Sequence, residues 1–244
     1  MSDGVIPISV TGIVLSLLPM VLLGWIYQRS NRGGGLILYA TARMLAQLFL
    51  MGFVLVFIFQ VESVFMMIPV VLFILSISSW IALRPLSIRN GKRYWRIFGS
   101  IGIVCGGMLF YILIIVIEPS PLYQPRYFIP LAGMIFANAM TAISLAGERF
   151  DDERSRGVPL DKAWSAAFKA ALIPQVNAFL AVGLVSLPGM MTGQIIAGVD
   201  PLLAIRYQIV VMAMIFGSAG LSVALYLRWD GKHPAPPPPQ VVGS

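Results

Sequence analysis

Residues 171–208, ALIPQVNAFLAVGLVSLPGMMTGQIIAGVDPLLAIRYQ, are apolar enough for a membrane span but contain several helix-breaking residues. The stretch includes Pro174 and Pro188, and four glycines follow from Gly183 onward. A spanning helix tolerates such breaks where the freed backbone N–H and C=O groups face protein or a water-filled cavity. The stretch therefore predicts a broken membrane helix, and a break of this kind indicates a pathway or a moving part.

The composition is that of a membrane protein. Hydrophobic residues make up 58% of the 244 residues, charged residues 11%, and the mean hydropathy is +0.87. Soluble domains carry about 25% charged residues. Apolar runs long enough to cross a hydrocarbon core roughly 30 Å thick recur along the chain. They lie at about 8–27, 35–60, 63–83, 97–117, 127–147, 172–197 and 202–227. We expect an all-α polytopic membrane protein with about seven transmembrane helices.

The placement of basic residues predicts the orientation. Of the 17 Lys and Arg residues, 15 lie in the first, third and fifth connections between spans, in the tail, or at Arg43 near the start of the second span. The other two are Arg126 and Arg206. Because cytoplasmic connections are enriched in basic residues, the N-terminus is expected outside and the C-terminus in the cytoplasm, as in a multi-pass protein of the bacterial inner (plasma) membrane. The net charge of +7 then indicates contact with membrane lipid, and no nucleic acid partner is expected.

Two domains of different character are expected. Residues 1–228 form the transmembrane domain, which includes a charged cytoplasmic loop and helix at 148–171. Residues 229–244 contain four consecutive prolines, a composition that favours an extended chain without a core. The tail is therefore expected to be disordered.

The cytoplasmic connection predicts a turn followed by a short helix. The segment 162–172, KAWSAAFKAAL, has small residues at helical spacing beside two aromatic ones, and Asp161 is the expected N-cap. Such a helix either docks in the groove of a partner or lies in the membrane interface with its Trp among the head groups. The residues of this element are Gly157, Pro159, Asp161, Trp164 and Phe168.

Polar or unusual residues inside the spans are candidates for a translocation path. The stripe Gly133, Ala137 and Thr141 is typical of close helix packing, so the neighbouring Asn138 serves either packing or the path. Asn177 similarly either clamps a kinked helix or lines the path. The candidate path residues are Asn138, Asn177, Pro188, Gly189, Met190, Met191, Gly193 and Gln194.

Several kinds of chemistry have no motif in this chain. The sequence contains no G-x-x-x-x-G-K-[ST], no H-E-x-x-H and no G-x-S-x-G, and its single His lies in the tail. Soft-metal sites need Cys or His beside methionine, and the spans offer only Cys105. We expect no catalytic residues, no metal site and no cofactor on this chain.

Several blocks of the C-terminal half resemble the FetB-type permease family, which includes bacterial iron export permeases and plant aluminium-tolerance half-transporters. The blocks are FIPLAGMIFANAM (128–140), AALIPQV (170–176), VGLVSLPGMMTG (182–193) and AGVDPLLAIRYQIVV (197–211). In the N-terminal half, ARMLAQL (42–48) is similar to an R-x-x-x-Q element of the family. The chain departs from the family pattern at Asn177 and Leu180, where an Asp and a Lys are expected.

The resemblance implies the permease subunit of an ABC transporter. Such a subunit exports a metal ion, such as iron, or a small solute, acts as a homodimer, and depends on a separate ATP-binding subunit that holds the ATP. The helix after Pro159 would then be the coupling element, with Trp164 or Phe168 filling a groove of the ATPase, and Pro174 would pass its movement to the break. The alternative is an ATP-independent channel or secondary carrier, and a third possibility is a membrane scaffold or lipid-modifying protein.

Overall fold

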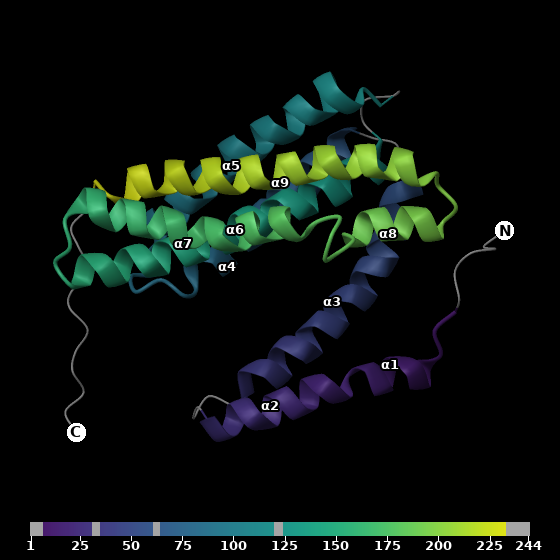
Figure 1. Ribbon diagram of the computed structural model, residues 1–244, viewed down its shortest axis with the longest axis horizontal. Helices are drawn as coiled ribbons and strands as arrows, with labels where there is room; N and C mark the ends of the chain where they lie inside the picture. Colours follow the sequence, from purple (N-terminus) through teal and green to yellow (C-terminus); the bar gives the residue numbers. More distant parts are fainter. Residues whose placement is uncertain (1–6, 31–34, 61–63, 120–123, 233–244) are drawn as a thin grey trace. The chain divides into compact units, whose positions relative to one another are not determined.

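The computed structural model describes residues 7–30, 35–60, 64–119 and 124–232, and the tail predicted to be disordered lies almost wholly outside them. Every regular element in these ranges is helical (Figure 1). The helices are α1 (Val10–Ser16), α2 (Leu18–Ser30), α3 (Gly35–Gln60), α4 (Val64–Leu83), α5 (Gly91–Tyr111), the π-helical η1 (Ile112–Ile117), α6 (Pro125–Ser155), α7 (Leu160–Ala181), α8 (Gly189–Ile196) and α9 (Pro201–Asp230).

The chain divides into two compact units. One comprises Met1–Glu62 with Ile196–Gly198, and the other comprises Ser63–Ile195 with Val199–Ser244. In the first unit α2 packs against α3, and a Cβ built on Gly24 would stand 3.7 Å from Cγ2 of Ile37. This is an ordinary van der Waals distance, so Gly24 lies in the contact between the two helices.

Five helices of the described chain are long and apolar enough to cross a membrane. They are Val10–Arg29, Ile37–Val56, Gly91–Ile117, Tyr127–Ser155 and Pro201–Asp230, and Met67–Leu83 forms a shorter apolar helix. The predicted polytopic α-helical class is confirmed. The predicted sixth span, 172–197, is not one helix, because it combines the second half of α7, an irregular segment and α8.

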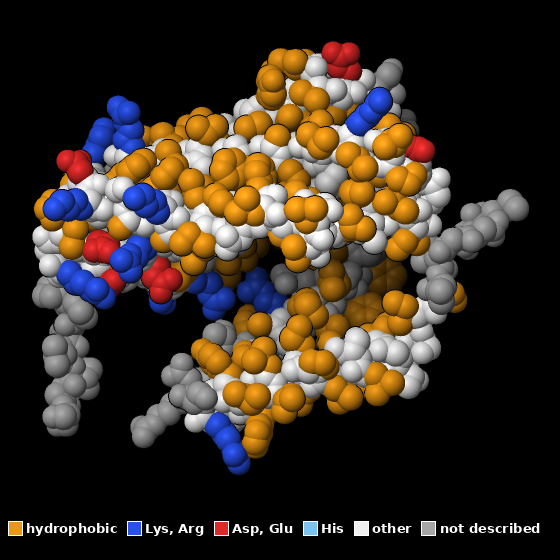
Figure 2. Space-filling view, viewed as in Figure 1, with side chains coloured by type: hydrophobic (Ala, Val, Ile, Leu, Met, Phe, Trp, Pro, Cys, Tyr) orange, Lys and Arg blue, Asp and Glu red, His pale blue; other side chains and the backbone are white. Residues whose placement is uncertain are grey.

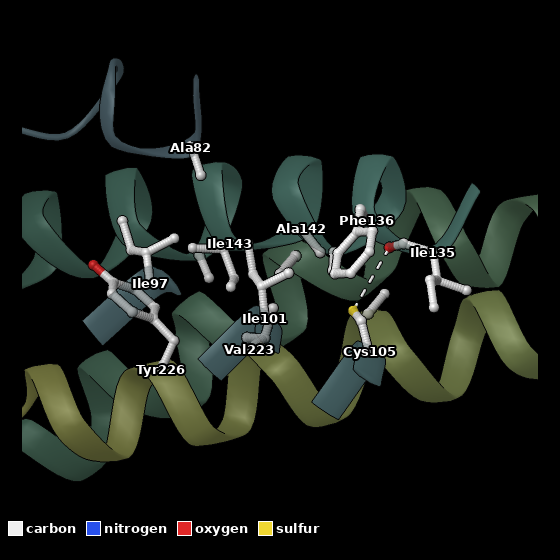
Figure 3. Close-up of a cluster of buried hydrophobic side chains, with 14 of the residues drawn as sticks. Ala82, Ile97, Ile101, Cys105, Ile135, Phe136, Ala142, Ile143, Val223 and Tyr226 are labelled. Atoms are coloured by element: carbon white, nitrogen blue, oxygen red, sulfur yellow. Dashed lines mark hydrogen bonds between the residues drawn. The ribbon is translucent and has the colours of Figure 1, made fainter. Parts of the chain in front are cut away.

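Helix α6 lies at the centre of the second unit and packs against α4, α5, α7 and α9. The core includes Ile101 and Cys105 of α5, Ile135 and Phe136 of α6, and Val223 of α9, all almost fully buried (Figure 3). Alanines on the same face of α6 let the neighbouring helices approach closely. These are Ala132, Ala139, Ala142 and Ala146.

The small-residue stripe that the sequence analysis assigned to packing lies on a different face of α6. Ala137 and Thr141 are exposed and Gly133 is only partly buried, so the stripe does not form the contacts of this unit. Small residues occur on several faces of α6, and the large buried side chains at Ile135, Phe136 and Ile143 decide which face is the core.

Helix α7 is longer than predicted. It runs without interruption for 22 residues from Leu160 to Ala181, with Pro174 inside it. Its N-cap residue is Pro159, so the expectation that Asp161 caps the helix is wrong. Asp161 lies in the first turn instead, where a carboxylate still interacts favourably with the positive end of the helix dipole.

Candidate functional site

The predicted break lies between α7 and α8, at residues 182–188. Gly183 has φ +81°, a left-handed conformation that favours glycine. The carbonyl of Ala181 accepts hydrogen bonds from the backbone N–H of Val185 (2.8 Å) and Ser186 (3.1 Å), and Gly183 N–H donates to Ser186 O (3.0 Å). The turn thus satisfies much of its own backbone, which is the condition for a break at membrane depth.

A groove of about 540 Å³ lies beside this break, between the end of α7, α8 and the first half of α9. Phe179, Leu187 and Met191 line one side, and Gln208 and Met212 of α9 line the other. Its lining is apolar except for the Gln208 amide. The groove therefore suits a guest that is largely apolar where it contacts the protein.

Gln208 is the polar feature of the groove that sequence analysis missed. Its side chain is 5% exposed, and its Oε1 has no hydrogen-bond partner among the described residues. A buried oxygen without a donor costs about 1–3 kcal/mol. The available signal was an amide in the first third of the last predicted span, 202–227, which is costly in lipid and by default a functional candidate.

Asn138 takes part in a contact between two helices. Its Nδ2 donates to Met134 O at 2.9 Å, and Nε2 of Gln175 on α7 donates to Asn138 Oδ1 at 3.2 Å. Gln175 is 8% exposed and was not singled out from the sequence. The pair clamps α6 to α7, which supports the packing interpretation of Asn138.

The other predicted path residues are distributed around the break. Met191 lines the groove, and Met190 packs against the core of the unit. Pro188 and Gln194 are partly buried, whereas Gly189, Gly193 and Asn177 are exposed. Oε1 of Gln194 is buried without a partner among the described residues, as in Gln208. The structure thus brings Met191 to the groove and leaves Asn138 and Asn177 out of its lining.

The predicted coupling turn lies where α6 passes into α7. Gly157 has φ +78° and its N–H donates to Arg154 O at 3.1 Å, and Pro159 immediately precedes the helix. On α7, the rings of Trp164 and Phe168 stack with centroids 4.9 Å apart and an interplanar angle of 12°. Both rings are partly buried against the core, so they attach α7 to the bundle.

The exposed surface of the coupling turn is formed by other side chains. Leu160, Asp161 and Lys162 are exposed in the first turn of α7, and Ser165 and Lys169 are exposed on the following turns. Charged side chains of the unit gather mainly at this end of the bundle (Figure 2). A partner at this end would therefore meet the first turn of α7 before it meets the stacked rings.

A buried ion-pair network connects three helices at the same end. Arg93 of α5 is 4% exposed, and its guanidinium donates to both carboxylate oxygens of Asp151 on α6, at 2.7 and 2.9 Å. It also donates to Asp230 of α9 at 2.7 Å and to Tyr226 Oη at 3.0 Å. Arg96 donates to the second oxygen of Asp230 at 2.6 Å. Two arginines thus neutralise two aspartates in a site largely closed to water.

This network adjoins the first turn of α7. A Cβ built on Gly231, the residue after Asp230, would stand 3.1 Å from Cδ1 of Leu160 and 3.7 Å from Cζ of Phe150. The end of α9 therefore lies directly against the start of α7. The sequence alone does not indicate that Arg93 and Asp151 meet, because they are 58 positions apart in the chain.

Among the residues that the structure describes, no group of three or more His, Cys, Asp or Glu side chains lies close enough to hold a metal ion. The chemistry available in the groove is that of an amide, two thioethers and hydrocarbon side chains.

Comparison with known proteins gives matches along nearly the whole chain. Residues 9–233 match the family described as "Uncharacterised protein family (UPF0014)". The UPF0014 membrane protein slr1647 of Synechocystis is 36% identical over 88% of this chain and 89% of its own length. No solved structure matches.

Two further relatives carry names that describe a role. The "Probable iron export permease protein FetB" of Escherichia coli is 37% identical over 79% of this chain and 80% of its own length. The "Protein ALUMINUM SENSITIVE 3" of Arabidopsis thaliana is 33% identical over 89% of this chain and 83% of its own length. These matches confirm the resemblance that the sequence blocks indicated. The chain is a multi-pass protein of the cell membrane and belongs to the UPF0014 family of membrane proteins.

Proposed function

We propose that this chain is the transmembrane permease subunit of an ABC transporter, and that it exports a metal ion or small solute. A separate ATP-binding subunit would supply the energy, and two copies of the chain would form the permease. The name of the Escherichia coli relative, an iron export permease, supports the transport role.

The observation that carries this proposal is the continuity of α7. One helix runs from the exposed turn at Gly157 to the break that begins after Ala181, beside the groove that contains Gln208. A helix transmits a displacement along its axis, and 22 residues span roughly 33 Å at 1.5 Å per residue. Force applied to the first turn would therefore reach the groove.

The docking surface of this subunit would be the first turn of α7 with the turn before it. Gly157 and Pro159 shape the turn, while Leu160, Asp161 and Lys162 present exposed side chains. Trp164 and Phe168 would hold the helix on the bundle, so that α7 and its neighbours respond together. This assignment gives the ring pair a different role from the one expected from sequence.

The topology that fits this role has seven crossings with the N-terminus outside. The five long apolar helices supply five of them, α4 supplies one, and α7 with α8 supplies another across the break. The ion-pair network and the coupling turn would then lie at the cytoplasmic face, the side on which an ATPase works.

The translocation path would pass the groove beside the break. Its guest would meet Gln208 and the thioethers of Met191 and Met212, and it would leave when movement of α7 changes the turn at Gly183. An amide whose oxygen is unpaired in one state is suited to accept a hydrogen bond from a guest or from a rearranged neighbour.

Reconstitution with the candidate ATPase tests the proposal. The chain, purified with a candidate ATP-binding subunit, is expected to form a stable complex in lipid nanodiscs and to raise the ATP hydrolysis rate of that subunit. Transport of an iron salt into inverted vesicles is expected to require ATP. Solute flux that proceeds equally without ATP or an ATPase would contradict the ABC assignment and favour a carrier.

A further inference from the structure

A second groove, of about 780 Å³, lies at the charged end between the first turn of α7 and the last turns of α9. Its two ends differ in chemistry. Asp161, Arg228 and Lys232 line one end, and Val104, Leu221 and Leu225 line the other. Leu160 and Asp161 in this lining also belong to the proposed ATPase docking surface, whereas the α9 and α5 residues of the groove have no part in the proposed transport mechanism.

The three charged side chains of the groove are free to bind a ligand. All three are exposed, and none of them belongs to an ion pair among the described residues. They differ in this respect from Arg93, Arg96 and Asp230 nearby, whose charges are already paired. The groove therefore offers two cationic groups and one anionic group at one mouth.

The length of the groove matches one leaflet of a bilayer. Leu221, Leu225 and Arg228 follow one another at spacings of four and three, so they share one face of α9, and Lys232 lies in the turn just beyond the helix. The ten helical residues 221–230 cover about 15 Å, close to half of a hydrocarbon core roughly 30 Å thick. Trp164 lies in the lining beside the charged mouth, where aromatic rings meet lipid head groups.

We propose that this groove binds a phospholipid whose head group carries a primary ammonium, as in phosphatidylethanolamine. Arg228 and Lys232 contact the phosphate through charge-assisted hydrogen bonds, and Asp161 accepts hydrogen bonds from the ammonium. One acyl chain follows the apolar half of the groove past Leu225 and Leu221. The inference depends on the chain lying in a membrane and not on the identity of any ATPase.

The charge pattern selects this lipid over the other common ones. A phosphatidylglycerol head group places no cation opposite Asp161. A choline head group is cationic but has no N–H to donate to the carboxylate. Of these three head groups, the one with ethanolamine satisfies both signs of charge with hydrogen bonds.

Native mass spectrometry of the purified full-length chain tests the site. Phosphatidylethanolamine, phosphatidylglycerol and phosphatidylcholine with identical acyl chains are titrated separately, and lipid adducts are counted. We expect tightest retention of phosphatidylethanolamine, and about thirtyfold weaker retention in the double variant Arg228→Gln/Lys232→Gln. Asp161→Asn is expected to abolish the preference for ethanolamine over glycerol while lipid still binds. Lys169→Gln, on an exposed part of α7 outside the groove, serves as the control and should bind as the unmodified chain does.

A second variant keeps the test decisive if the charge changes alter the fold. Leu225→Trp fills the apolar end of the groove without changing its charge, so it should also weaken phosphatidylethanolamine retention. In a separate experiment, a photoreactive residue at position 221 should form a covalent adduct with the lipid. Equal retention of the three lipids by the unmodified chain would overturn the proposal. Cross-linking of position 221 to a second copy of the chain would overturn it as well. Neither result bears on ATPase coupling, because no ATPase is present.

Discussion

Arg93 of α5 and Asp151 of α6 form a two-pronged ion pair in which both side chains are 4% exposed. Because each charge has lost its water, removing one partner leaves the other buried and unpaired, at a cost of about 3–5 kcal/mol. We expect Arg93→Gln to lower the free energy of unfolding by that amount. The measurement is reversible denaturant unfolding in micelles.

The matched control for this change is an exposed ion pair at the end of α6. Asp152 of α6 pairs with Arg156 just after the helix, and their side chains are 38% and 65% exposed. Exposed pairs contribute about 0–1 kcal/mol, so Arg156→Gln should have little effect. Equal destabilisation by the two variants would show that the network does not hold α5, α6 and α9 together.

The break depends on the left-handed conformation of Gly183. A side chain at φ +81° is strained by about 1–2 kcal/mol, so Gly183→Ala is expected to destabilise the protein and to slow transport. Gly189 begins α8 with an ordinary backbone and nothing within 4 Å of a built Cβ. Gly189→Ala should therefore leave thermal stability unchanged or raise it. Thermal unfolding in detergent compares the two variants, and an opposite order of stability would refute the proposed turn.

The buried amide of Gln208 is expected to lower stability and to support transport. Replacing the buried amide by leucine removes an unpaired oxygen, so Gln208→Leu is expected to raise the free energy of unfolding by about 1–3 kcal/mol. Because the groove then has no polar contact, transport should fall. Ile209→Ala shortens an exposed side chain of the same groove and leaves the Gln208 amide in place. The contribution of the amide to transport should therefore be preserved. If vesicles that contain the Gln208→Leu variant transport as fast as the unmodified chain does, Gln208 does not line the translocation path.

The two parts of the coupling element should respond differently to substitution. Trp164→Ala removes a partly buried, stacked ring from the contact between α7 and the core, and it is expected to lower stability by about 1–3 kcal/mol. Leu160→Glu changes an exposed side chain and is expected to weaken ATPase binding at nearly unchanged stability. Thermal unfolding and co-purification with the ATPase are the paired measurements. A stable Trp164→Ala protein that no longer binds the ATPase would show that the Trp164 ring itself contacts the ATPase, as the sequence analysis expected.

The sequence predicted the features that depend on local chemistry. Pro188 and the nearby glycines located the break, because these residues disfavour a continuous helix, and apolar length identified the membrane helices. Pro174 was misleading in one respect. It was expected to mark the boundary between a short cytoplasmic helix and a span, but α7 continues through it, as membrane helices can when neighbours satisfy the freed backbone.

The features that were missed depend on the packing of distant segments. Arg93, Asp151 and Asp230 come from three different helices, and nothing in their local sequence indicates that they meet. Gln175 and Gln208 became candidates only when burial showed one paired and the other without a partner for its oxygen. On α6, the face that packs was decided by large side chains rather than by the more regular small-residue stripe.

The most direct test of coupling through α7 is the ATP hydrolysis rate of the reconstituted complex with the charge-reversed variant Asp161→Arg. Lys92→Ala, an exposed basic residue at the same end of the bundle, is the control. If the first turn of α7 contacts the ATPase, Asp161→Arg should abolish both complex formation and stimulation of hydrolysis, while Lys92→Ala retains them. Full stimulation by Asp161→Arg would contradict the claim that α7 couples ATP hydrolysis to the groove.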